Sequence, residues 1–209
     1  MAKLVDAQAS GACGVQTLCR FESGSRHHRI FLGGYMTNPA FQSDYELLDV
    51  VDEHDRVIGQ EVRLVIYDKK LNFRAINVFV ENDKGQLWIP RRVANKRLFP
   101  LALDMSCAGH VGSGETYEQA LIRETIEELG IDLTVTPYEE VAYMTPYAHN
   151  TSAFTRVYRI RQNEVPEFNT GDFCEYYWLT PQELVALLEQ GESAKSDLIK
   201  MTCYVYGVK

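Results

Sequence analysis

The chain has 209 residues, 45% of them hydrophobic, which is enough apolar material for one globular domain with a buried core. Its net charge is −8 and its sequence pI is about 5.2. We therefore expect no nucleic-acid polymer as a partner, because backbone phosphates require a basic face. No run of the sequence approaches the ~18 apolar residues of a membrane span, so we expect no membrane partner either. The five cysteines are odd in number and show no C-x-x-C spacing, which argues against a zinc site or a disulfide framework and predicts a cytoplasmic protein.

The N-terminal 35 residues differ in composition from the rest of the chain. They contain four Lys and Arg against two acidic residues, five Gly, and no helical or strand period. We expect a disordered tail over residues 1–43, followed by one domain over residues 44–209. Met36 opens a segment that reads like an ordinary protein start, and we hypothesise that residues 1–35 are absent from the native protein. The alternative is a targeting or basic binding arm.

The first half of the domain reads as short strands separated by polar turns. Apolar runs bounded by turn residues, such as Asn82–Gly85, predict strands, and one amphipathic stretch predicts a short helix. The predicted elements are a strand at 47–51, a turn at 52–55, a strand at Val57–Val62, a helix at Arg63–Leu71, a strand at Ala75–Val80 and its hairpin partner at Gln86–Pro90.

The second half of the domain combines strands with longer helices. Gly130 is a stop signal for the helix that precedes it. Thr180–Glu183 has the pattern of a capping box with Pro at the first helical position. The other predicted elements are strands at Leu101–His110, Leu133–Met144, Ala153–Arg161 and Cys174–Leu179, a polar loop at Asn163–Asp172, and helices from Pro181 to about Glu189 and from about Ala194 to Tyr204.

The helix that ends at Gly130 carries three carboxylates on one face. Glu124, Glu127 and Glu128 stand at positions i, i+3 and i+4, which are neighbours on a helix surface. From Glu115 to Glu128 there are five Glu and one Arg, and like charges this close repel unless a cation lies among them. Hard oxygen ligands in this number predict Mg²⁺ or Mn²⁺. The alternative is a solvated acidic helix face, which is our interpretation of Glu118.

The segment from Gly109 to Ile131 resembles the Nudix box. Glu115 follows Gly109 after five residues, and seven residues later comes Arg-Glu-x-x-Glu-Glu-x-Gly-Ile. The one departure is Thr125, where the family prefers an apolar residue. The resemblance implies an α/β/α sandwich with a mixed central sheet, from about Tyr45 to the C-terminus. It also implies an enzyme that uses Mg²⁺ or Mn²⁺ to cleave the diphosphate linkage of a small nucleoside diphosphate-linked or other organic diphosphate. A homodimer is common in that family.

The resemblance also implies roles for individual residues of the box. One of the helix carboxylates, or an acid elsewhere, would act as general base for the attacking water. The implied roles are metal ligation by Glu124, Glu127, Glu128 and the carbonyl of Gly109, orientation of a box carboxylate by Arg123, and support of the loop and helix by Glu115 and Gly130.

Two groups outside the box are candidates for the rest of the site. The segment 91–97 contains four cations. It reads either as a solvated loop or as a patch for the substrate diphosphate, in which Arg91, Arg92 and Lys96 make the contacts. Nudix proteins often carry an acid just ahead of a Trp-Leu strand, which here favours Asp172 or Glu175 as a distal acid. The alternative is an exposed carboxylate in a polar loop.

Two other functions fit the same resemblance. Isopentenyl-diphosphate isomerases share the fold but place a Cys immediately before the Gly-His pair, where this chain has Ala108. Cys107 is one residue away, and on a strand a shift of one residue reverses the side on which a side chain lies. The second alternative is a nucleotide-sensing domain without catalysis, which tends to lose box acids, whereas this chain retains them all. The substrate itself is not readable from the sequence.

Overall fold

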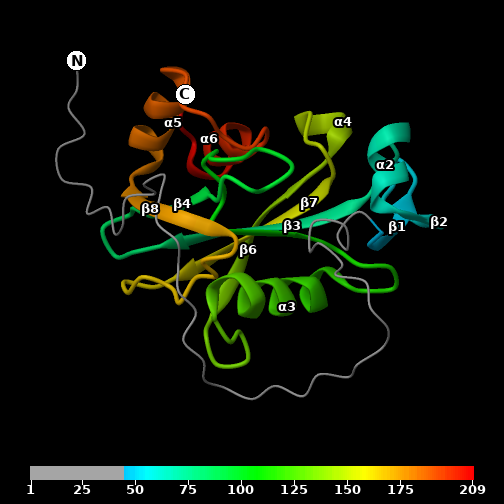
Figure 1. Cartoon of the computed structure of the whole chain (residues 1–209), viewed down its shortest axis with the longest axis horizontal. Coiled ribbons are helices and arrows are strands. Elements are labelled where there is room, and N and C mark those ends of the chain that lie inside the picture. Colours follow the sequence, from blue (N-terminus) through cyan, green and yellow to red (C-terminus); the bar gives the residue numbers. More distant parts are fainter. Residues whose placement is uncertain (1–44) are drawn as a thin grey trace.

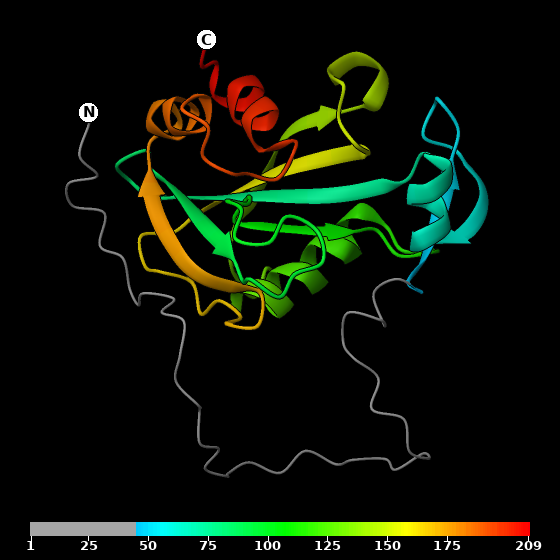
Figure 2. The same cartoon turned by 45° about the horizontal axis from the view of Figure 1, so that its top comes forward.

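The computed structural model describes residues 45–209. The predicted tail, residues 1–43, and the predicted start of the domain at residue 44 lie outside the described residues. Figures 1 and 2 show a central sheet with α3 (Tyr117–Leu129) on one face and α5 (Pro181–Glu189) and α6 (Leu198–Tyr206) on the other. The predicted α/β/α sandwich with a mixed sheet is confirmed. The strands are β1 (Leu47–Val51), β2 (Val57–Val62), β3 (Arg74–Glu81), β4 (Leu87–Arg92), β5 (Cys107–His110), β6 (Tyr138–Met144), β7 (Phe154–Arg161) and β8 (Phe173–Leu179). The helices are α2 (Arg63–Lys69), α3 (Tyr117–Leu129), α4 (Pro146–His149), α5 (Pro181–Glu189) and α6 (Leu198–Tyr206).

The main sheet is built around β3. Its order is β6-β7-β3-β4-β8, and β5 pairs with the first half of β3 on the same side as β4. The β3–β7 pair is parallel and the other pairs are antiparallel. Since β3 is covered on both faces, its central residues form the near-continuous apolar run expected of a buried strand.

Alternation along β3 separates two hydrophobic cores. Ile76 and Val78 pack in one core with Leu121 of α3. Phe79 packs in the other core with Leu184 of α5. Successive strand residues point to opposite faces, so this single strand holds α3 below the sheet and α5 and α6 above it (Figure 2).

Local sequence signals set both ends of α3. The Thr116 side chain accepts a hydrogen bond from the backbone N–H of Gln119, and the Gln119 side chain accepts one from the backbone N–H of Thr116. Gly130 ends the helix in the left-handed conformation, with φ of 65°. Thr125 is fully buried, and its hydroxyl donates to the carbonyl of Leu121 at 2.8 Å. A Thr therefore packs at this helix position without leaving a polar atom unsatisfied.

Two of the predicted strands begin later than expected. The segment before β5 is irregular because Phe99 and Leu101 have positive φ values of 52° and 57°, a conformation that no strand contains. The segment before β6 is a turn, in which the Asp132 side chain accepts a hydrogen bond from the N–H of Thr134 at 2.8 Å. Local side-chain to backbone bonding of this kind competes with strand pairing.

The β1–β2 hairpin and α2 form a separate unit beside the main sheet, with their own small core (Figure 1). Asp55, at the hairpin turn, joins the unit to the sheet and to α3. Its carboxylate accepts hydrogen bonds from Arg74 Nε at 2.6 Å, from the Tyr143 hydroxyl at 2.9 Å and from the Tyr117 hydroxyl at 3.1 Å. Asp49 of β1 reaches the loop ahead of α3, where it accepts from Ser113 Oγ at 2.8 Å. The hairpin therefore braces the start of the acidic helix.

In residues 45–209 there is no helix with both the length and the apolar character that crossing a membrane requires.

We predict that Asp55→Ala destabilises the protein by about 2–4 kcal/mol, because it removes the carboxylate partner of the Arg74 guanidinium, leaving it only the backbone carbonyl of residue 55. It also removes a residue type that tolerates the positive φ of 61° at this position. Urea unfolding measures the change. Asp55→Asn keeps an acceptor and the backbone preference, so we expect a smaller loss. Glu53→Ala, in the same turn, is the control and should change stability by less than about 0.5 kcal/mol. Equal effects of Asp55→Ala and Glu53→Ala would contradict the bracing role.

Candidate metal and diphosphate site

The acidic face of α3 lies against the end of β5. Gly109 on β5 approaches Glu124 so closely that a Cβ atom at this position would lie 2.0 Å from the Glu124 Cδ atom. Only glycine permits this approach. It brings the Glu124 carboxylate against the strand backbone at Gly109. Carboxylate and backbone carbonyl oxygens are the donors that a hard divalent cation prefers.

Glu128 lies one turn further along α3 and contacts the same strand. Its Oε2 accepts a hydrogen bond from the backbone N–H of Ala108 at 3.1 Å. Burial, followed by the charges of Glu124 and Asp104, raises the pKa of Glu128 to about 8. Burial also raises the pKa of Glu124 to about 7, although Arg123 opposes this rise. Two adjacent carboxylates are thus held where negative charge is costly, and a divalent cation would offset that cost.

Glu127 differs from its two neighbours. Its side chain is 59% exposed, and it forms an ion pair with Arg123 at 3.6 Å. Among the described residues, no three Asp, Glu, His or Cys side chains already form a cluster that could hold a metal ion. Of the three predicted carboxylate ligands, Glu124 and Glu128 thus lie against β5, whereas Glu127 lies at the surface.

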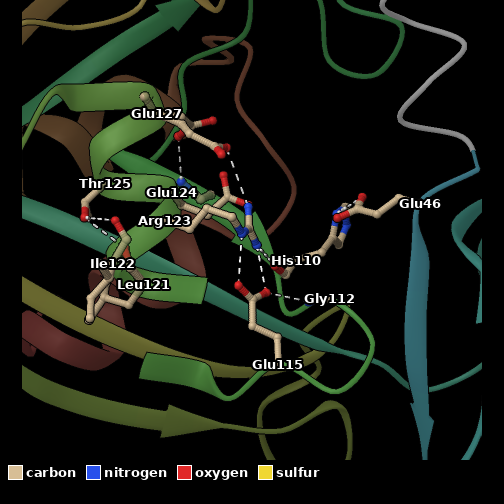
Figure 3. A network of polar contacts seen from close by, with 12 residues as sticks. Glu46, His110, Gly112, Glu115, Leu121, Ile122, Arg123, Glu124, Thr125 and Glu127 are labelled. Atoms are coloured by element: carbon tan, nitrogen blue, oxygen red, sulfur yellow. Dashed lines mark hydrogen bonds and ion pairs between the residues drawn. The ribbon is translucent and has the colours of Figure 1, made fainter. Parts of the chain in front are cut away.

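Arg123 connects the box loop, β5 and α3 (Figure 3). Its Nε and Nη2 atoms donate to the two carboxylate oxygens of Glu115 at 3.0 and 2.9 Å. Nη2 also donates to the carbonyl of His110 at 3.0 Å, and Nη1 donates to Glu124 at 2.6 Å. Glu115 in turn accepts from the backbone N–H of Gly112 at 2.8 Å. These bonds place the Arg123 guanidinium against the Glu124 carboxylate and tie Glu115 to the loop. The orienting role of Arg123 and the supporting role of Glu115 stay predictions.

Three cations of the predicted basic patch form ion pairs with acids from other parts of the chain. Arg91 pairs with Glu175 and with Glu192, each at 2.9 Å. Arg92 pairs with Asp104 at 2.6 Å.

A third cation of the patch, Lys96, pairs with Asp172. Each of the two candidate distal acids, Asp172 and Glu175, is thus bound to a cation of the patch.

Sequence reasoning missed three residues that lie next to the box carboxylates. Asp104 is 3% exposed by side chain and binds both Arg92 and Lys195. The Glu46 carboxylate accepts a hydrogen bond from His110 Nδ1 at 3.1 Å, on the opposite side of His110 from the Arg123 contacts (Figure 3). A buried acid among the apolar residues before β5 was a usable signal for Asp104. Nothing local marks Lys195 or Glu46, because they reach the site only through the tertiary fold.

Cys107 bears on the isomerase alternative. It is fully buried in the core beneath α3, together with Val78 and Leu121. Burial, followed by the charges of Glu128 and Glu124, raises the pKa of its thiol well above the usual value. Such a thiol stays protonated and is a poor general base or nucleophile. The neighbouring Ala108, at the position where the isomerases have Cys, offers no reactive group.

Comparisons with known proteins agree with this geometry. The NUDIX domain model matches residues 71–201. An uncharacterised Nudix hydrolase of Nostoc sp. is 54% identical over 78% of this chain and 97% of its own length. The crystal structure of DR0079 from Deinococcus radiodurans superimposes with a TM-score of 0.73 at 43% identity, covering 77% of this chain and 99% of that one. An isopentenyl-diphosphate Delta-isomerase of Photorhabdus laumondii is 30% identical over 68% of this chain and 82% of its own length.

The matched domain contains the acids of α3, the Gly109 approach and the Arg123 network. The chain belongs to the Nudix family.

Proposed function

We propose that the protein is a divalent-metal-dependent diphosphatase, which cleaves the diphosphate linkage of a nucleoside diphosphate-linked or other organic diphosphate in the cytoplasm. Family membership supports hydrolysis of acid anhydrides in general. The observation that supports the finer proposal is the pair Glu124 and Glu128, held with raised pKa values against β5, Glu124 at Gly109 and Glu128 at the N–H of Ala108. The cytoplasmic assignment rests on the cysteine pattern.

The chemistry divides between the cation and the protein. Glu124, Glu128 and the Gly109 carbonyl would hold Mg²⁺ or Mn²⁺, and Glu127 would join them by turning its exposed side chain inward. The bound cation would neutralise phosphate oxygens and lower the pKa of a water molecule. Arg123 keeps Glu124 oriented, and one of the helix carboxylates accepts the proton of the attacking water. The diphosphate binds at this site, and the surrounding side chains select the rest of the substrate.

Isomerisation of an isopentenyl-type diphosphate is the second candidate, because a relative with that activity in its name shares 30% identity. The buried, protonated Cys107 and the alanine beside it oppose it. The two reactions are separated by a panel of nucleotide sugars, dinucleotides, oxidised nucleotides and isopentenyl diphosphate, incubated with Mg²⁺. Release of phosphate or nucleoside monophosphate supports hydrolysis, whereas a shifted double bond without phosphate release supports isomerisation. Tight binding without any turnover would indicate a sensing domain.

We predict that Glu128→Gln lowers Mg²⁺-dependent turnover of the best substrate in the panel by at least about 100-fold, because it removes a charged ligand. The protein should remain folded. Glu118→Gln, on the exposed side of the same helix, is the matched control and should retain wild-type turnover. A rate for Glu128→Gln close to that of the control would refute the metal assignment.

We also predict a pH-dependent effect of Glu128→Gln on stability without metal. The pKa of Glu128 is raised from its ordinary value of 4.5 to about 8 in the folded protein. The folded state therefore binds more protons between these pH values, and this group's contribution to stability falls as pH rises. The variant should melt at a higher temperature than wild type at pH 8, by at least about 2 °C, with the difference vanishing near pH 5. Addition of Mg²⁺ should reverse the order at pH 8, which thermal denaturation with and without EDTA would reveal.

The close approach at Gly109 gives a further prediction. Gly109→Ala should weaken Mg²⁺ binding by at least about tenfold, since the new methyl group forces Glu124 out of position. Gly59→Ala is the control, because a Cβ there meets nothing within 4 Å. Isothermal titration with Mg²⁺ measures both, and undiminished affinity in Gly109→Ala would argue against Glu124 as a ligand at this strand.

A further inference from the structure

A lysine from the C-terminal part of the chain lies beside the segment that leads into β5. Lys195 follows α5, and its Nζ atom is 3.5 Å from Asp104 Oδ1. This distance exceeds that of a normal N–H···O hydrogen bond. Asp104 already has closer partners, because Oδ2 accepts from Arg92 Nη1 at 2.6 Å and Oδ1 accepts from the N–H of Met105 at 2.9 Å. Asp104 is therefore satisfied without Lys195.

Backbone pairing fixes the position of Lys195. Its N–H donates to the carbonyl of Leu103 at 2.9 Å, and the N–H of Leu103 donates to the carbonyl of Ser193 at 2.8 Å. Leu103 and Ala194 also form a parallel bridge. The segment after α5 is thus bound alongside the segment that leads into β5. This pairing holds the start of the Lys195 side chain next to the box, although the two are about seventy residues apart in the sequence.

The contacts of Asp104 show which groups surround Lys195. The segment that contains Asp104 leads into β5, where the N–H of Ala108 donates to Glu128 Oε2 at 3.1 Å. Arg92 lies on the other side of Asp104, and its Nε atom is buried without a hydrogen-bond partner among the described residues. A buried donor without a partner is costly. Two cations, each with unused donors, thus flank the single carboxylate of Asp104.

We propose that Lys195 is a substrate-binding residue, which contacts the phosphoryl oxygens of the diphosphate together with Arg92. The inference rests on the proposed function, because the diphosphate would reach this position from the cation held by Glu124 and Glu128. Lys195 supplies a point charge with three donors, and Arg92 supplies a planar donor pair. Phosphate oxygens are suited to both. One negative charge on Asp104 against two cations leaves this corner of the site attractive to an anion.

The alternative role is a brace, in which Lys195 only helps to hold Asp104. If Lys195 is a brace, removal of its ammonium group would lower the folding stability and loosen the Arg92 side chain. A substrate contact would affect the affinity for a diphosphate and leave the free protein intact. These two roles can be separated with a diphosphate that the enzyme does not hydrolyse.

The experiment is titration calorimetry of full-length protein with methylenediphosphonate, in the presence and absence of Mg²⁺. We expect Lys195→Met to weaken Mg²⁺-dependent binding of this probe about tenfold to a hundredfold, the loss typical of a charged hydrogen bond. Lys195→Arg should keep most of the affinity. Lys84→Met, on the exposed β3–β4 turn, should bind like wild type. Titration with Mg²⁺ alone should show no weakening in Lys195→Met, because removing a cation cannot disfavour the binding of another.

The outcomes separate this inference from the proposed function. Equal probe affinity in wild type and Lys195→Met, with Mg²⁺ required in both, would overturn the role of Lys195 and leave the diphosphatase proposal standing. A lower melting temperature of Lys195→Met with unchanged probe affinity would identify a brace. Absence of Mg²⁺-dependent probe binding in wild type would overturn both. If Lys195→Met does not fold, Lys195→Gln keeps a hydrogen-bonding group without the charge and carries the same expectation.

Discussion

The four-way contact of the Arg123 guanidinium holds the site together. It binds Glu115 with two parallel hydrogen bonds, Glu124 with a third and the carbonyl of His110 with a fourth. A planar fork of fixed geometry can do this, whereas an ammonium group would not hold two carboxylates and a strand carbonyl in one plane. As a result the loop between β5 and α3 has one arrangement, and the distance between the strand and the acids of the helix is set.

This arrangement holds two carboxylates close together and out of water in the folded protein. Glu124 and Glu128 are drawn toward β5 by the packing of α3 on the sheet, through Leu121 and Leu129, and not by attraction between charges. The hydrophobic core thus places carboxylates where their pKa values rise to about 7 and about 8. Strain of this kind is what a binding site for a divalent cation needs, because the cation then has a large advantage over water as a partner.

The cations around the site are distributed by the tertiary fold. Arg91, Arg92 and Lys96 are close in the sequence, yet they bind different carboxylates. Arg91 binds Glu175 of β8 and Glu192 after α5, Arg92 binds Asp104 before β5, and Lys96 binds Asp172 in the loop before β8. The pairing turns a run of positive charge into three separate braces. One of them, Arg92 with Asp104, meets Lys195 next to the box, so a small cationic corner remains beside the acids.

The sequence determined the parts of this protein that depend on neighbours along the chain. The spacing of Glu124, Glu127 and Glu128 follows from helix periodicity, the ends of α3 from Thr116 and Gly130, and the buried strand β3 from its apolar run. Gly109 was identifiable by its place in the motif, although the reason for it, contact with Glu124, is a tertiary one.

Only the tertiary structure decided which distant residues meet. The partners of Arg91, Arg92 and Lys96, the bracing by Asp55, and the approach of Lys195 to Asp104 all join segments separated by many residues. Long-range pairing depends on sheet order and on which faces are buried, and no local pattern encodes these. The sequence by itself therefore determined the acidic helix and the family to which the chain belongs. The fold decided which charges surround that helix, because contact between distant side chains exists only after the two cores have packed on either side of β3.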